Sequence, residues 1–198
     1  VELQQPLHEA LEGVRRVVAD GAPFDPATMQ ATLVIAASDY QQYALLTRFS
    51  VALRTEAPMV RIAWRALDVL ALAAQLERGE VDLAVATPNH APAAMRQHQL
   101  YYEDYTVIAR QGHPAVQGHV SLDVFCTLEH VVVSLQGGGF SGPTDAALEA
   151  VGRRRTVALS TSGFLIVPEV VSRSDMIALV PRRLAGGWSG RLQVLDPP

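Results

Sequence analysis

Short apolar runs alternate with amphipathic stretches along the first half of the chain. Residues 31–37 read ATLVIAA, and the runs at residues 60–64 and 81–86 have similar length and composition. Apolar runs this short are typical of strands that are buried on both faces of a sheet. The stretches between them, residues 38–57 and 69–78, are expected to be helices, because Ser38-Asp39 and Asp68 can cap their starts and Gly79 can end the second. The order strand, helix, strand, helix, strand predicts a parallel α/β unit with right-handed crossovers.

The second half of the chain has the same alternation with less regular spacing. Five segments are expected to be extended and three to be helical. The predicted strands are residues 100–110, 130–135, 156–159, 176–180 and 192–195, and the predicted helices are residues 121–125, 145–151 and 163–172. Pro168 is unexpected within the last helix, because a proline inside a helix removes a backbone donor. The chain should therefore fold as two βαβ-rich halves, with a boundary near residues 102–106.

The first 20 residues carry a narrow apolar stripe at helical spacing. Leucine or valine occupies positions 3, 7, 11, 14 and 18. Such a stripe is typical of a coiled-coil seam between subunits, and equally of an amphipathic helix packed on its own domain. The pattern alone leaves both interpretations open.

The charge and the cysteine content narrow the function classes. The formal net charge is -4, and all 16 basic residues are arginine, which excludes lysine chemistry such as a Schiff base or a P-loop. A mildly acidic chain is not typical of a DNA-binding module, so any DNA contact should lie outside these residues.

The single cysteine, Cys126, excludes an internal disulfide and fits a reducing cytoplasm. No apolar run approaches the length of a bilayer, and no signal peptide is seen at residues 1–11.

Catalytic and cofactor motifs are weak. Gly137, Gly139 and Gly142 match the G-x-G-x-x-G fingerprint after a predicted strand, but no acidic residue follows the next strand to hold a ribose. A glycine-rich turn that lets the backbone approach a ligand is the better interpretation. No G-x-S-x-G motif and no histidine or cysteine pair with metal-ligand spacing is present, so we expect neither a cofactor nor a metal.

The carboxyl ends of the predicted strands form the most plausible binding site. Ligands of open parallel sheets lie beyond these ends, and the residues there offer hydroxyls, an amide, an arginine and aromatic rings. The candidate ligand-contacting residues are Ser38, Asp39, Tyr40, Arg65, Ala66, Thr87, Gln136, Phe140, Ser162 and Phe164. Each has a plainer interpretation: Ser38 and Asp39 as a helix cap, the phenylalanines as core, and Arg65 as a surface charge.

Six segments occur in an order that matches one known family. They are FDPA at 24–27, SDY at 38–40, LERGEVDLAV at 76–85, LYYEDYTVIARQGHP at 100–114, AALEAVGRRRTV at 146–157 and SDMIALVPRRLA at 174–185. Over nearly its whole length the chain resembles the regulatory domain of LysR-type transcription regulators. Within that family, FDPA and the GHP turn resemble the subgroup of nodulation-protein-D-like and salicylate- or nitroaromatic-responsive regulators.

The resemblance implies a fold and a division of the chain. The fold is the α/β periplasmic-binding-protein type 2 fold, with two Rossmann-like lobes joined by two crossover strands. Residues 1–22 would be the remnant of the dimerisation helix, residues 28–104 plus 190–198 the first lobe, and residues 105–189 the second lobe. A winged helix-turn-helix would precede residue 1, and a further strand and helix would follow residue 198.

The resemblance also implies a function without catalysis. A small effector, aromatic or an aromatic acid, would bind between the lobes and control transcription in a homodimer or, in the full-length protein, a tetramer. Ser38 and Tyr40 match the family's pocket after the first strand, Arg65 and Ala66 match the end of the second strand, and Phe140 and Phe164 match the second-lobe wall. Two alternatives share the fold: a solute-binding protein of a transporter, and an enzyme with Asp39 or Glu169 as its acid or base.

Overall fold

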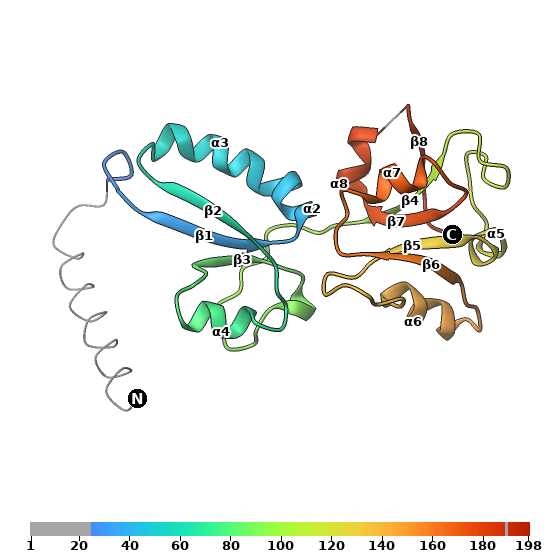
Figure 1. Cartoon of the computed structure of the whole chain (residues 1–198), viewed down its shortest axis with the longest axis horizontal. Coiled ribbons are helices and arrows are strands. Elements are labelled where there is room, and N and C mark those ends of the chain that lie inside the picture. Colours follow the sequence, from blue (N-terminus) through green and yellow to red (C-terminus); the bar gives the residue numbers. More distant parts are fainter. Residues whose placement is uncertain (1–24, 189) are drawn as a thin grey trace.

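The chain folds into two lobes that lie side by side (Figure 1). The computed structural model describes residues 25–188 and 190–198. The first lobe holds strands β1 to β3 and the second holds β4 to β8. Residues 86–104, which include the short 3-10 helix Pro88–His90, connect the lobes and provide one of the expected crossovers. The predicted helix over residues 1–20, and with it the dimerisation helix assigned to residues 1–22, lies outside the described residues.

The first lobe is built on a three-stranded parallel sheet, as the sequence predicts. The strands are β1 (Thr32–Ala37), β2 (Arg61–Ala66) and β3 (Leu83–Val85), in the order β2-β1-β3. Ala37 is in register with Ala66 on one side and with Val85 on the other. The three strands therefore end at one edge of the sheet, and the segments that follow them lie together there.

Helices cover both faces of this sheet. They are the continuous α2 (Asp39–Gln41), π-helix Gln42–Leu46 and α3 (Thr47–Glu56), and then α4 (Leu72–Glu77). Successive residues of β1 point to opposite faces. Ile35 and Ala37 pack with Leu46, whereas Ala36 packs with Leu72 on the other face. A strand buried on both sides has no polar face, which explains the uninterrupted apolar sequence of β1.

The second lobe is built on a mixed five-stranded sheet in the order β6-β5-β7-β4-β8. Strand β5 is parallel to β6 and β7, and β4 is antiparallel to β7 and β8. The strands are β4 (Tyr105–Arg110), β5 (Glu129–Val133), β6 (Thr156–Thr161), β7 (Ile177–Pro181) and β8 (Leu192–Leu195). The helices are α5 (Leu122–Thr127), α6 (Pro143–Ala150), α7 (Val167–Val171), α8 (Arg182–Ala185) and the 3-10 helix Gly186–Trp188.

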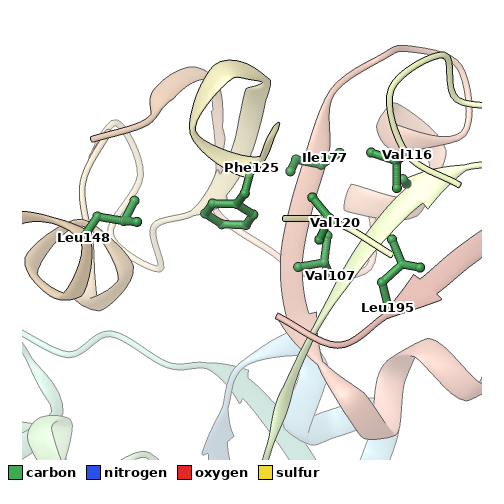
Figure 2. Close-up of a cluster of buried hydrophobic side chains, with 8 residues drawn as sticks. Val107, Val116, Val120, Phe125, Leu148, Ile177 and Leu195 are labelled. Atoms are coloured by element: carbon green, nitrogen blue, oxygen red, sulfur yellow. The ribbon is translucent and has the colours of Figure 1, made fainter. Parts of the chain in front are cut away.

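Two hydrophobic clusters sandwich the sheet of the second lobe. The first, shown in Figure 2, gathers side chains of β4, β7 and β8 with those of α5, α6 and the segment between β4 and α5: Val107, Val116, Val120, Phe125, Leu148, Ile177 and Leu195. The second cluster, on the opposite face, contains Ile108 and Leu192 together with Val167 and Val171 of α7. Adjacent residues of one strand thus serve different clusters, as the two-residue period of a strand requires.

The C-terminal strand corrects one expectation about the lobes. Residues 190–198 were expected to complete the first lobe, but β8 pairs antiparallel with β4 in the sheet of the second lobe. The reason is that Leu192 and Leu195 bury their side chains in the two clusters of that lobe, at 3% and 6% exposure. The sequence identifies the strand correctly but carries no signal for its partner.

The helix predicted over residues 163–172 is shorter than expected. Helix α7 begins only at Val167, which places Pro168 in its first turn. A proline is accepted there because the first N–H groups of a helix have no intrahelical acceptor. The residues before it, 162–166, form a loop after β6.

One arginine of the run 153–155 is buried, although the sequence suggests a solvated surface. The Arg155 side chain is only 3% exposed. Its Nε lies 2.9 Å from Asp145 Oδ1, and its Nη2 lies 2.9 Å from Asp145 Oδ2. Asp145 also accepts the N–H of Gly142 at 2.7 Å, which closes the start of α6. The guanidinium next to Asp145 lowers the pKa of that carboxyl. This pair ties α6 to the beginning of β6.

Replacing Arg155 by methionine should destabilise the domain. The change removes one partner of a nearly buried ion pair, and the remaining carboxylate of Asp145 is 28% exposed and can partly rehydrate. We expect the free energy of unfolding to fall by about 2–3 kcal/mol, measured by urea denaturation. Arg154→Met, at the exposed neighbour, should change it by no more than about 0.5 kcal/mol. Equal effects of the two substitutions would contradict the assignment.

A second buried group, His130, should make stability depend on pH. His130 is fully buried, its Nε2 lies 2.8 Å from the carbonyl oxygen of Phe125, and its ring packs edge-on against the Phe125 ring. Since a carbonyl only accepts, Nε2 carries the proton of the neutral ring. Burial lowers the pKa of His130 from 6.5 to about 4.

Because this pKa is depressed, the stabilising contribution of neutral His130 is complete above pH 6.5 and is lost as the pH falls toward 4. We expect the free energy of unfolding of the wild type, measured by urea denaturation, to fall by about 1.4 kcal/mol for each pH unit of acidification within this window, relative to His130→Gln. The other histidines are common to both proteins, so the difference isolates His130. Parallel curves for the two proteins would refute the prediction.

Candidate functional site

The carboxyl edges of the two sheets face each other, and Asp39 connects them. Asp39 follows β1, and its two carboxylate oxygens accept the backbone N–H groups of Phe164 at 3.0 Å and Leu165 at 2.8 Å. The latter two residues belong to the loop after β6 in the second lobe. Asp39 also accepts the N–H of Tyr40 at 2.8 Å. Three N–H donors thus surround one carboxylate at the meeting point of the lobes, and hydrogen bonds to a charged acceptor are among the stronger kind.

Gly163 allows this close approach. A Cβ atom built on Gly163 would lie 2.6 Å from Asp39 Oδ2 and 3.1 Å from its Cγ. Real Cβ atoms are not found at such distances, so any larger residue at position 163 would push the carboxylate away from its donors. The glycine is required by the contact between the lobes and not by its own backbone angles.

Tyr40 and Phe164 form an aromatic contact beside this carboxylate. Their ring centroids are 5.9 Å apart in an edge-on arrangement. Tyr40 is 5% exposed, and its hydroxyl donates to the Glu103 carboxylate. Burial, together with this hydrogen bond, raises the pKa of Tyr40 well above its usual value. The phenol therefore acts as a neutral donor that fixes the ring at the edge of the first lobe.

Glu103 extends the network from the crossover into the second lobe. Its carboxylate lies 3.0 Å from Arg183 Nε and accepts the Arg183 N–H at 3.3 Å. The Arg183 guanidinium also stacks over the Tyr101 ring at 4.8 Å from the centroid. Tyr40, Glu103 and Arg183 link three separate parts of the chain: the first lobe, the crossover and α8.

Ser38 is occupied by the start of the helix. It is 6% exposed, and its hydroxyl and backbone N–H both donate to the side-chain oxygen of Gln41, the latter at 2.8 Å. The Gln41 N–H lies 3.4 Å from the same hydroxyl oxygen. This is a capping box, in which the serine satisfies backbone groups that the helix leaves free. The plainer interpretation of Ser38 as a helix cap accounts for every one of these contacts.

The remaining candidates of the first lobe follow β2 and β3. Arg65 donates to the carbonyl oxygen of Glu80 at 3.3 Å, and its Nη1 lies 3.9 Å from the Glu80 carboxylate. Ala66 is exposed at the end of β2, next to Ala37. Thr87 is exposed, and its hydroxyl lies 3.2 Å from His90 Nδ1. The guanidinium of Arg65 is therefore engaged within its own lobe.

The candidates of the second lobe lie on the loops that follow β5 and β6. Gln136 and Ser162 are exposed, and the Phe140 ring is 58% exposed. The glycine-rich turn between Gln136 and Phe140 is a tight turn, with positive φ angles of 75° and 72° at Gly137 and Gly138. Ser160 Oγ donates to the Gly139 carbonyl at 2.7 Å and holds this turn against the end of β6.

The structure thus brings Asp39, Tyr40 and Phe164 into direct contact and arranges the other candidates along the same two edges. Sequence reasoning missed four contributors: Leu165, Tyr101, Glu103 and Arg183. It also missed Leu135, which reaches from the second lobe onto the apolar cluster around Leu72. The one sequence signal for Tyr101 and Glu103 was the cluster of tyrosines and acidic residues in the LYYEDY segment at the predicted boundary.

Two surface hollows lie away from this face. One, of about 400 Å³, is lined by residues 30–32, Met59 and Arg61 at the opposite end of the first sheet, and the other, of about 410 Å³, lies under residues 111–118.

Within residues 25–188 and 190–198, no group of three or more histidine, cysteine or acidic side chains could hold a metal ion. None of the helices described has the length and apolar character needed to cross a membrane.

Comparisons with known proteins identify relatives over most of the chain. The transcriptional activator NahR of Pseudomonas putida is 30% identical over 183 residues, which are 92% of this chain and 61% of NahR. The chain therefore spans about three fifths of that relative. Among solved structures, the probable transcriptional regulator PA0477 of Pseudomonas aeruginosa has a TM-score of 0.80 at 28% identity and covers 100% of this chain and 66% of its own.

The regulatory domain of MexT, a transcriptional activator in Pseudomonas aeruginosa, has a TM-score of 0.73 at 28% identity, covering 87% of this chain and 84% of its own. These relatives are named as regulators of transcription. Residues 27–198 match the family model of the LysR substrate binding domain. The predicted family and fold are confirmed: the chain belongs to the LysR substrate binding domain family and has the periplasmic-binding-protein type 2 fold.

Proposed function

We propose that this chain is the effector-sensing part of a LysR-type DNA-binding transcription regulator and that its effector binds between the lobes, around Asp39. The observation that carries this proposal is the set of polar contacts between the lobes. The Asp39 carboxylate and the Glu103–Arg183 pair join the lobes, and the exposed side chains of Thr87 and Phe140 lie on the segments that follow β3 and β5. Contacts of this kind can be exchanged for contacts with a ligand.

The mechanism is a shift between two arrangements of the lobes. An effector that contacts both edges binds one arrangement of the lobes more tightly than the other. This difference in affinity favours the angle between the sheets that belongs to the first arrangement. The crossover at residues 86–104 joins the lobes, and Glu103 on it is hydrogen-bonded to Tyr40 of the first lobe and Arg183 of the second, so a change in the angle would be felt by these contacts. In a homodimer, or a tetramer of the full-length protein, a change of angle would alter the spacing of the paired DNA-binding domains and so the level of transcription.

The partners follow from this role. DNA would be bound by a winged helix-turn-helix outside this chain, and the protein would act in the cytoplasm without a membrane partner. The effector would be a small aromatic molecule or aromatic acid, as the resemblance to the salicylate- or nitroaromatic-responsive subgroup suggests. The domain itself would have no catalytic role, since Asp39 is engaged by three backbone N–H donors and Glu169 is paired with Arg173 and Arg191.

A solute-binding protein of a transporter has the same fold and is the main alternative. The relatives named above are regulators, which favours transcription control over transport. Glu169 is poorly suited to the enzyme alternative as well, because Arg191 and then Arg173 lower the pKa of its carboxyl.

A thermal-shift screen against small aromatic acids, amides, phenols and amino acids tests the proposal. A ligand that binds only the folded domain stabilises it by about 2.7 kcal/mol at roughly 100 times its Kd, which corresponds to about 5–10 °C in midpoint. We expect Phe140→Ala to reduce the shift caused by a bound compound, because this ring is exposed at the second-lobe edge.

Val151→Ala is the matched control. Val151 is 62% exposed, but it lies at the other end of α6, far along the chain from the glycine-rich turn. It should leave the ligand-induced shift unchanged. The proposal would be refuted if substitutions throughout the interlobe edge left both binding and inducible transcription by the full-length protein unchanged.

A further inference from the structure

The donors around Asp39 form a site for an anion that the protein itself fills. The N–H groups of Phe164 and Leu165 point at one carboxylate, with one donor on each oxygen. Two adjacent N–H groups that converge in this way are how many proteins bind the carboxylate of a ligand. Here the carboxylate comes from the opposite lobe, and the glycine at position 163 leaves just enough space for it.

The charged side chains around this position leave no unpaired cation in the described network that would attract a second anion. Arg183, in α8 of the second lobe, is paired with Glu103, and Arg65 contacts Glu80. In the described part of the chain, no arginine or histidine makes an ion pair or hydrogen bond with Asp39. The two acidic groups closest to the interlobe face in this network, Asp39 and Glu103, add negative charge to it.

A carboxylate ligand would therefore meet two obstacles. It would have to displace Asp39 to reach the N–H pair, and the displaced carboxylate would remain close by without a cation. Like charges at short range in a partly buried place repel strongly, because water screens them poorly there. An uncharged ligand meets neither obstacle, and the partly exposed Phe164 ring, which packs on the buried Tyr40 ring, offers it an aromatic contact.

We propose that Asp39 is a specificity-determining residue: its carboxylate fills the anion position of the interlobe face, so that the domain accepts an uncharged aromatic effector and rejects the corresponding carboxylic acid. The choice of effector class rests on the proposed function, whereas the filled anion position does not. Asp39 acts here as an internal substitute for a ligand carboxylate and also fastens the two lobes together.

Chemical rescue tests the anion position without any knowledge of the effector. Asp39→Ala removes the carboxylate and should lower the thermal midpoint by about 5 °C, because the N–H groups of two lobes lose a charged acceptor. Sodium formate supplies the missing group. We expect 100 mM formate to restore at least half of the lost midpoint in Asp39→Ala, compared with sodium chloride at equal ionic strength.

The controls for rescue are the wild type and Asp123→Ala, whose side chain is 82% exposed and pairs with Arg153 on the surface. Formate should have no specific effect on either. Gly163→Ala is the second variant: its Cβ should displace Asp39, so it should lower the midpoint as Asp39→Ala does but show no rescue, since the space for formate is lost. Failure of formate to rescue Asp39→Ala would overturn the inference.

A panel of matched compounds tests the effector class. Each aromatic acid is paired with its primary amide, beginning with benzoate and benzamide, which have nearly the same shape and differ in charge. We expect the wild type to bind amides at least tenfold more tightly than the matched acids at pH 7.5. Asp39→Asn, which keeps the size of the side chain and removes its charge, should reduce this preference at least tenfold. A wild type that binds an acid as tightly as its amide would overturn the inference.

The two failures are distinguishable. If no compound of any class binds the wild type, the proposed sensing of a small molecule is contradicted, while formate rescue still decides whether the anion position exists. If compounds bind but acids are preferred, sensing stands and the role given to Asp39 falls.

Discussion

The arrangement of the two lobes depends on satisfying backbone N–H groups at their junction. The loop after β6 contains Phe164 and Leu165, whose N–H groups have no partner within their own sheet and instead donate to Asp39 of the first lobe. An unpaired backbone donor at a partly buried place costs free energy comparable to a lost hydrogen bond. The same carboxylate accepts the N–H of Tyr40 in the first turn of the helix that Ser38 caps, so one side chain contacts backbone groups of both lobes.

The architecture of the first lobe could be predicted from sequence because each local signal agreed with the final fold. Strand β1 is apolar on both faces, the helix after it begins with a capping box at Ser38, and the parallel order follows from the alternation of elements. The second lobe was less predictable. Strand β8 was recognised but assigned to the wrong sheet, because strand pairing depends on the side chains of Leu192 and Leu195 finding two cores that are distant in sequence.

The candidate site was predictable in position and less so in detail. The rule that ligands lie at the carboxyl ends of parallel strands pointed to Asp39, Tyr40 and Phe164, and these three side chains meet in the folded chain. Glu103 and Arg183 were missed because their importance comes from a contact over 80 positions of sequence. The burial of Arg155 could not be read from its run of three arginines, because it depends on the partner Asp145, which lies on another element.

Two backbone amides report most directly on the contact between the lobes. If the Asp39 carboxylate holds the lobes together in solution, the amides of Phe164 and Leu165 must be protected from hydrogen exchange, although the Leu165 side chain is 44% exposed. Amide exchange resolved by residue, in the wild type and in Asp39→Asn, measures this. The account predicts slow exchange at both amides in the wild type and clearly faster exchange in the variant. Exchange at the rate of a free peptide in the wild type would contradict it.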